Sequence, residues 1–386
     1  NGSLVFHVRV RGVWFTPIST CKNRFISYAC AWSTGTEMGR KMIEDILRKL
    51  NERQDLTAEE AYGLMISLIN DELSSVQIVS FEVALLLKGP TLTEITAIAR
   101  SLRDHCVKVS PRVEGELMDT CGTGGGLSTF NISTSVAFVA AAAGIPVAKH
   151  GSRSITSLAG SAEVLEALGA QINQGPRSVE KLIEEVGIAF LYAPIFHPVM
   201  DKMVPPEKDF GIKTTFYTMI GPLINPTQAT RHVMGVYKPE LLDTVPQVAK
   251  ALGYTRALFA HGVEGLDEIS LFGKTRIREL NHGSITEYEI TPEDFGLKRC
   301  RLADIATGTP EANAVMIRDV FSGKDKGPRR QAVLLNAAAA LMVADKAASL
   351  SDGLRLAKDV IDSGAAQDKL NEYIEASHDY KSLQIS

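Results

Sequence analysis

The sequence predicts an α/β protein with a small all-helical N-terminal domain, residues 38–107, and a larger α/β domain, residues 108–386. Residues 38–107 carry apolar side chains at helical spacing between capping signals. From residue 108 onward strand-like and helix-like segments alternate, which is typical of a mostly parallel central sheet flanked by helices. The chain has 386 residues, of which 45% are hydrophobic, so it can bury the cores of two domains.

Residues 1–37 differ in composition from the rest of the chain. They hold both tryptophans and four Lys or Arg residues against one acid, Glu37. We interpret this stretch as an extension outside the fold, with chain initiation at Met38, because no amphipathic helical period runs through it. The alternative is an organelle transit segment, since such segments are rich in Arg and Ser and poor in acids.

The helical domain is predicted from three kinds of signal. The segment MGRKMIEDILRKL, residues 38–50, places its apolar residues on one stripe. Capping boxes at Thr57–Glu60 and Thr91–Glu94 begin two further helices. Between them SSVQIVSFEVALLLKG predicts another helix, which ends at Gly89 and Pro90.

The α/β domain is predicted from the order of its segments. Strands are expected at GELMDTCG, IPVAKHG, AQIN, IAFLYAP and RALFAHG, and helices at STSVAFVAAAAG with a cap within residues 131–133, SAEVLEALG, SVEKLIEEVG and ELLDTVPQVAKALG. Three C-terminal helices are expected at RRQAVLLNAAAALMVAD, SDGLRLAKDVIDSG and AQDKLNEYIEA.

Composition limits the classes of partner. The net charge is −4 and the pI is about 6.1, so nothing favours nucleic acid, and a phosphate site would be local. The five cysteines form no CxxC pair, which argues against a disulfide or zinc framework. No segment approaches the roughly 18 to 20 apolar residues of a membrane span. We therefore expect no membrane partner and a soluble, cytoplasmic protein, or an organellar one if residues 1–37 are a transit segment.

A glycine-rich loop is the first candidate binding element. Gly122-Thr123-Gly124-Gly125-Gly126 follows a predicted strand and precedes a predicted helix, so its amides can approach an anion at a helix N-terminus. It is neither a P-loop nor a dinucleotide fingerprint. Alone it is as often a tight connection as a binding site.

Two further loops carry charge at the ends of neighbouring strands. Lys149-His150-Gly151-Ser152-Arg153 brings cations and is followed by the hydroxyls of Ser154, Thr156, Ser157 and Ser161. Asp267 and Glu268 follow RALFAHG, and paired carboxylates beside a polyanion indicate Mg²⁺. Each alone is ordinarily a solvated surface turn. Because strand ends meet at one edge of a parallel sheet, we expect them to converge with the glycine loop on a site for several phosphates.

Over residues 38–380 the chain resembles the anthranilate phosphoribosyltransferase family. Six segments carry the resemblance, in this order along the chain: DTCGTGGGLSTFNIST, VAKHGSRSITS, GSAEVLEALG, IFHPVM, GIKTTFYTMIGPLINP and GLDEIS. The resemblance implies a fold shared with pyrimidine nucleoside phosphorylases and a homodimer through the helical domain. It implies Mg²⁺-dependent transfer of phosphoribose from phosphoribosyl pyrophosphate to the amine of anthranilate, in tryptophan biosynthesis. Electrostatic stabilisation of the departing pyrophosphate is then the main catalytic effect, and no acid or base is assigned.

Carried over motif by motif, the resemblance implies three sets of site residues. Ser133, Asp267 and Glu268 would hold the metal. Ser152, His197, Glu207, Lys208 and also Gly122 would contact the acceptor. The donor would contact Gly122, Thr123, Gly124, Gly125, Gly126, Thr129, Asn131, Ser133, Thr134, Lys149, His150, Gly151, Arg153, Ser154, Thr156, Ser157 and Ser161.

The sequence departs from the family mainly on the acceptor side. Gly126 stands where the family has an acid, Ser152 where it has Asn, and Glu207, beside Lys208, where an ungapped count expects the acceptor-binding Arg. The family's Arg-Thr-x-Phe-Asn is KTTFY at residues 213–217. Two alternatives therefore stay open: a phosphoribosyltransferase for another amine or heterocycle, and a donor-binding homologue without turnover. A nucleoside phosphorylase is disfavoured, because its Lys/His-Ser-Thr-Gly-Gly loop is absent.

Overall fold

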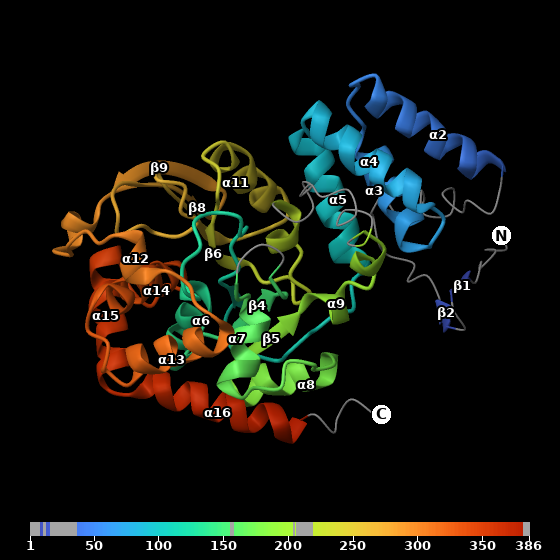
Figure 1. Cartoon of the computed structure of the whole chain (residues 1–386). Coiled ribbons are helices and arrows are strands. Elements are labelled where there is room, and N and C mark those ends of the chain that lie inside the picture. Colours follow the sequence, from blue (N-terminus) through green and yellow to red (C-terminus); the bar gives the residue numbers. More distant parts are fainter. Residues whose placement is uncertain are drawn as a thin grey trace.

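A computed structural model describes residues 8–10, 13–15, 37–154, 158–203, 205 and 219–380 (Figure 1). It contains a helical N-terminal domain beside a larger α/β domain, as the sequence predicts. Before the helical domain, β1 (Val8–Val10) and β2 (Val13–Phe15) pair as a short antiparallel ribbon that the sequence analysis did not predict.

The helical domain consists of α2 (Glu37–Asn51), α3 (Ala58–Ile69), α4 (Ser75–Lys88) and α5 (Leu92–His105). Both predicted capping boxes are confirmed, at Thr57 and Thr91, and α4 begins with a third at Ser74 and Gln77. On α2 the predicted apolar stripe is buried at Ile43, Ile46 and Leu50. Capping and burial thus agree on where these helices begin and which face they bury.

The α/β domain is built on a seven-stranded sheet in the order β5-β4-β3-β6-β7-β8-β9. The strands are β3 (Met118–Asp119), β4 (Val147–Gly151), β5 (Ile188–Tyr192), β6 (Arg231–Gly235), β7 (Arg256–Gly262), β8 (Thr275–Asn281) and β9 (Ser284–Ile290). The first five in this order pair in parallel, and β8 and β9 add an antiparallel hairpin. The prediction of a mostly parallel sheet is confirmed, although it omitted β6, β8 and β9.

Helices cover both faces of this sheet (Figure 1). The buried core on one face includes residues of α6 (Ile132–Ala142), α7 (Ser161–Leu168), α8 (Pro176–Lys181), α13 (Pro310–Phe321), α14 (Pro328–Val343), α15 (Leu350–Asp362) and α16 (Ala365–Asp379). The predicted strand AQIN is wrong, because residues 170–173 form an irregular connection between α7 and α8. Its alternating pattern serves instead to bury Ala170 and Ile172 in this core.

The other face of the sheet shares its core with the helical domain. One buried cluster joins residues of α2–α5 to α11 (Leu241–Ala251) and to side chains of β6, β7 and β8. Arg100 and Arg103 on α5 also donate hydrogen bonds to the backbone carbonyls of Ala251 and Leu252. The helical unit is therefore packed against the α/β domain. No helix in the described part of the chain is long and apolar enough to cross a membrane.

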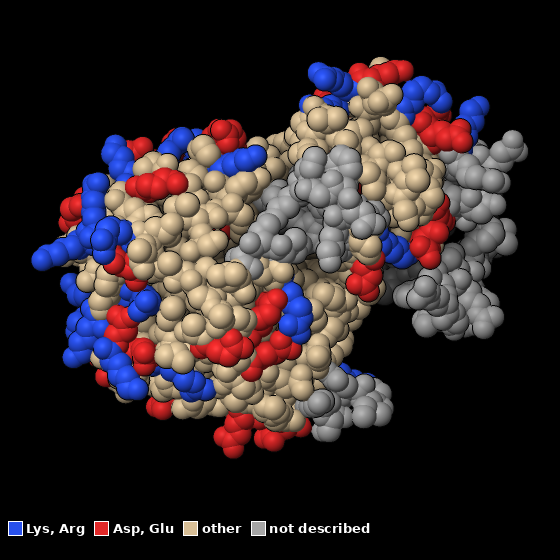
Figure 2. Space-filling model, viewed as in Figure 1, with Lys and Arg blue, Asp and Glu red and all other residues tan. Residues whose placement is uncertain are grey.

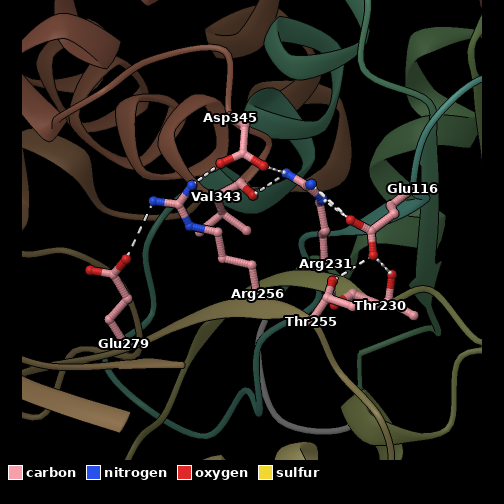
Figure 3. A network of polar contacts seen from close by, with 8 residues as sticks. All are labelled: Glu116, Thr230, Arg231, Thr255, Arg256, Glu279, Val343 and Asp345. Atoms are coloured by element: carbon pink, nitrogen blue, oxygen red, sulfur yellow. Dashed lines mark hydrogen bonds and ion pairs between the residues drawn. The ribbon is translucent and has the colours of Figure 1, made fainter. Parts of the chain in front are cut away.

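A network of charged side chains ties together the amino ends of the central strands (Figure 3). Arg231 pairs with Glu116 and Asp345, and Arg256 pairs with Asp345 and Glu279. Partial burial raises the pKa of Glu116, but hydrogen bonds from Thr255, Thr230 and Arg231 outweigh it and lower the pKa to about 2. The network lies at the end of these strands opposite to the loops described next. On the face of the molecule seen in Figure 2, acidic and basic side chains are interspersed.

Candidate active site

A cleft of about 460 Å³ lies at the carboxyl ends of β3, β4, β5 and β7. The three predicted loops meet there, as expected from the position of strand ends in a parallel sheet. The predicted site residues that line the cleft are Gly122, Thr123, Gly124, Gly125, Gly126, Thr129, Asn131, Ser133, Lys149, His150, Gly151, Ser152, Arg153, Ser154, Ser161, His197, Asp267 and Glu268.

Five predicted residues are not among those that line the cleft. Thr134 is fully buried behind it and borders a small cavity of about 10 Å³ with Phe138 and Tyr373. Thr156, Ser157, Glu207 and Lys208 lie outside the described residues.

The glycine loop is held against two other strand ends by its backbone. The Thr123 amide donates to the Gly235 carbonyl at 2.9 Å, and the Leu127 amide donates to the Gly265 carbonyl at 3.2 Å. Gly124 and Gly125 have positive φ angles of 62° and 88°, which favour glycine. The loop is thereby fixed beside the Asp267 turn, and its conformation explains why glycines occur here.

Asp119, which the sequence analysis did not select, organises the loops from below. Its carboxylate is fully buried. One oxygen accepts from the amides of Thr120, Cys121 and His150 at 2.7, 3.0 and 3.1 Å, and the other accepts from the Asn225 amide group at 2.7 Å. Hydrogen bonds to both oxygens compensate the cost of burying the charge. The carboxylate thus sets the glycine loop in register with β4.

Lys149 projects from β4 toward the N-terminus of α6. Lys149 is 3% exposed, and its Nζ lies 3.4 Å from Ser133 Oγ and 3.5 Å from Thr120 Oγ1. These long contacts with neutral hydroxyls leave the ammonium able to bind an anion in the cleft.

The predicted helix cap is only partly right: Asn131 occupies the N-cap position of α6, but its side chain makes no capping hydrogen bond.

Asp267 and Glu268 lie beside the glycine loop after β7. Burial, together with the charge of the neighbouring Asp267, raises the pKa of Glu268 to about 8, although Lys149 acts in the opposite direction. Within the described residues no group of three or more His, Cys, Asp or Glu side chains is arranged to hold a metal. A cation here would therefore take its remaining ligands from a bound substrate or from water, a pattern that suits Mg²⁺.

Two buried histidines form the opposite wall. The rings of His150 and His197 meet edge to face with centroids 5.2 Å apart. Burial lowers the pKa of His150 to about 4 and lowers that of His197 well below its usual value. Both imidazoles are therefore neutral at pH 7 and can exchange hydrogen bonds with an uncharged group.

Arg153 lies at the rim of the cleft and is already paired. Its guanidinium makes a two-pronged contact with Glu166 on α7, with N–O distances of 2.7 and 2.8 Å. Its central carbon lies 5.8 Å from the centre of the Tyr192 ring. The sequence identified Arg153 but gave no signal for its partner Glu166.

Two domain descriptions match the chain. A helical bundle domain of the glycosyl transferase family matches residues 44–106, and the a/b domain of that family matches residues 114–367. Curated relatives include anthranilate phosphoribosyltransferases of Desulfosudis oleivorans and Methanobrevibacter smithii. Each is 45% identical over 335 residues, which cover 86% of this chain and 98% or 99% of the relative.

Solved structures agree in fold. The anthranilate phosphoribosyltransferase of Thermus thermophilus superimposes with a TM-score of 0.81 at 40% identity, covering 86% of this chain and 99% of the other. The Saccharomyces cerevisiae enzyme, solved in complex with phosphoribosyl pyrophosphate and Mg, superimposes with a TM-score of 0.81 at 27% identity, covering 89% and 100%. The chain belongs to the anthranilate phosphoribosyltransferase family of the glycosyl transferases.

Proposed function

We propose that this chain transfers phosphoribose from phosphoribosyl pyrophosphate to the amine of anthranilate, with Mg²⁺, and releases pyrophosphate. The observation that carries the proposal is the meeting of the glycine loop, Lys149 and the Asp267–Glu268 pair in one cleft. Together they offer backbone amides, a cation and metal-binding carboxylates, which a donor bearing several phosphates requires. Relatives that carry this activity in their names share 45% of their residues with the chain over most of its length.

The donor would be bound along the glycine loop and the strand end of β4. Its phosphates would accept hydrogen bonds from loop amides and from the hydroxyls of Thr129 and Ser133. Lys149 would supply a fixed positive charge, because its Nζ already lies beside Ser133. Asn131, Gly151, Ser154 and Ser161 would complete this half.

The metal would be held by Asp267 and Glu268, with Ser133 close by. The residues fit this role, because burial and the adjacent Asp267 carboxylate raise the pKa of Glu268, and a cation would favour the charged form of both side chains. Mg²⁺ in this position would neutralise charge on the departing pyrophosphate. Lys149 and the loop amides would stabilise the same charge, and they are already in position in the structure without a donor.

The acceptor would lie against His150 and His197. We assign His150 to this side, although the motif placed it with the donor, because its ring contacts His197. Neutral imidazoles orient an arylamine without protonating it, and a neutral amine needs no strong base to attack the anomeric carbon. Ser152 and Gly122 also line the cleft and would contact the acceptor or the ribose.

A different acceptor is the second candidate. Glu207 stands where the family has the Arg that would meet the anthranilate carboxylate, and a carboxylate there repels an acidic acceptor. Lys208 is the neighbouring cation that would replace it. Another aromatic amine or heterocycle is favoured if Lys208 does not take that role.

We propose that the helical domain forms a homodimer interface along α4. Val76 and Leu87 on this helix are 75% and 71% exposed, and Val79, Val83 and Leu86 between them are partly exposed. An apolar stripe over three turns of a surface helix is suited to burial against a second copy. Light scattering should give twice the chain mass, and Val76→Asp with Leu87→Asp should give a monomer. A native chain that is monomeric at micromolar concentration would contradict the interface.

The reaction is tested by pyrophosphate release. The full chain is supplied with phosphoribosyl pyrophosphate, with or without Mg²⁺, and with anthranilate or with aniline, which lacks the carboxylate. The proposal requires Mg²⁺-dependent release with anthranilate. Release only with other acceptors would support the second candidate. Donor binding by calorimetry without release for any acceptor would identify a non-catalytic homologue.

A further inference from the structure

One of the cationic side chains of the cleft, Arg153, is already paired with an acid of the same chain, Glu166. The described residues that line the cleft include two cationic side chains, Lys149 and Arg153. Both terminal nitrogens of Arg153 are directed to the two oxygens of Glu166. The edge of the guanidinium best suited to a bidentate phosphate contact is therefore already used by an internal anion.

Two acidic side chains of helix α7 contact the loop that carries Arg153. The Glu163 carboxylate accepts from the backbone amides of Ser154 and Gly160 and so fixes the loop backbone. The carboxylate of Glu166, one turn further along α7, accepts from the guanidinium of Arg153 and, among the described residues, makes no contact with the loop backbone. Removing the Glu166 charge should therefore release the guanidinium from this carboxylate, with Tyr192 still beside it, without moving the backbone that carries it.

The pair is open to solvent and therefore weak. The side chains of Arg153 and Glu166 are 45% and 38% exposed, and exposed ion pairs contribute little because water screens them. A contact between a guanidinium and a multiply charged phosphate is stronger than one with a single carboxylate. Arg153 can therefore exchange Glu166 for a phosphate without large cost elsewhere in the fold.

We propose that Glu166 sets the affinity for the donor by holding Arg153 until a donor phosphate displaces it. The proposal rests on the proposed function, because it takes phosphoribosyl pyrophosphate as the donor. Glu166 is not a catalytic residue: it acts through Arg153 and opposes donor binding by competing for the same cation. It follows that a chain without the Glu166 charge binds the donor more tightly than the native chain does.

The test compares Glu166→Gln, Arg153→Ala and the double variant. Calorimetry measures binding of phosphoribosyl pyrophosphate in the presence of Mg²⁺. Glu166→Gln should tighten binding by about two- to fivefold, the value of a typical exposed ion pair. Arg153→Ala should weaken binding, and adding Glu166→Gln to it should change nothing further, because the two act through one contact. The KM for the acceptor should stay the same in Glu166→Gln.

Glu372→Gln on α16 is the control, because it removes an exposed acid that pairs with Lys369 away from the cleft. It should leave donor affinity unchanged. Unchanged or weaker donor binding in Glu166→Gln overturns the proposal, as does a tightening that persists without Arg153 or a change confined to the acceptor KM. No donor binding by the native chain would overturn the proposed function together with this inference, whereas native donor binding that ignores Glu166→Gln overturns the inference alone.

Discussion

Replacing Gly235 with alanine should disable the site without touching any group that contacts substrate. Gly235 ends β6 directly under the Asp267 turn. A Cβ atom on this residue would lie 1.6 Å from the backbone oxygen of Asp267 and 2.2 Å from its carbonyl carbon. Ordinary contact begins at 3.4 Å, so one of the two backbones must move by about 2 Å. Because both atoms of the turn belong to the main chain, no side-chain rotation can relieve the overlap.

The expected effect follows from how far the metal-binding pair would move. A misplacement of about 1 Å in a catalytic group already costs roughly 100-fold in rate. We therefore expect Gly235→Ala to lower kcat at least about 100-fold and to raise the Mg²⁺ concentration needed for half-maximal rate. Overpacking should also cost about 1 to 3 kcal/mol of unfolding free energy.

The assay is pyrophosphate release over a range of Mg²⁺ concentrations, together with thermal unfolding. Gly253→Ala serves as the control, because Gly253 has a φ of 87° and nothing within 4 Å of its added Cβ. It should cost about 1 to 2 kcal/mol in backbone strain and leave kcat and the Mg²⁺ dependence intact. Native kcat and native Mg²⁺ dependence in Gly235→Ala would refute the argument that this glycine positions Asp267.

Three further changes test other parts of the structure. Asp267→Ala with Glu268→Ala should abolish Mg²⁺-dependent transfer while circular dichroism stays native, and near-native turnover would exclude the pair as metal ligands. Lys149→Ala should weaken donor binding about 10- to 100-fold in calorimetry, the equivalent of roughly 1.5 to 3 kcal/mol, and an effect on the acceptor alone would place Lys149 on the wrong side. Glu116, whose pKa falls from 4.5 to about 2 on folding, should stabilise the chain above pH 4.5 and lose that contribution as the pH falls toward 2. Urea unfolding of Glu116→Gln should therefore depend less on pH between 5 and 2 than unfolding of the native chain, and identical pH profiles would contradict the assignment.

The parts of the fold that could be predicted are those with local signals. The capping boxes at Thr57 and Thr91 mark their helices because the cap is made within four residues. The strand β6 was missed because RHVMG is short and mixes polar and apolar residues that only the neighbouring strands bury. The β8–β9 hairpin escaped for a related reason: β9 is mostly exposed, so its residues carry little apolar pattern.

The site divides in the same way. The glycine loop, Lys149 and the Asp267–Glu268 pair could be predicted, because each follows a strand and has an unusual composition. Asp119 could not, although it precedes the loop, because its role depends on Asn225, which is 106 residues away in the chain. The role of Gly235 likewise depends on a backbone contact with a different strand end. Contacts between distant segments leave no trace in a single local pattern.

The two halves of the cleft differ in how tightly their residues are constrained. The donor half is built largely from backbone, so a changed residue there must still fit the packing between loops. Gly126 illustrates this: a Cβ would lie 2.5 Å from Asp267 Oδ1 and 2.7 Å from the Gly265 carbonyl. An acidic side chain at this position would not fit the observed packing of the glycine loop against the Asp267 turn. On the acceptor side, side chains such as Ser152 and His197 line the cleft. Substitutions that tune the acceptor therefore act through side chains, whereas a substitution in the donor half must also fit the backbone packing between loops.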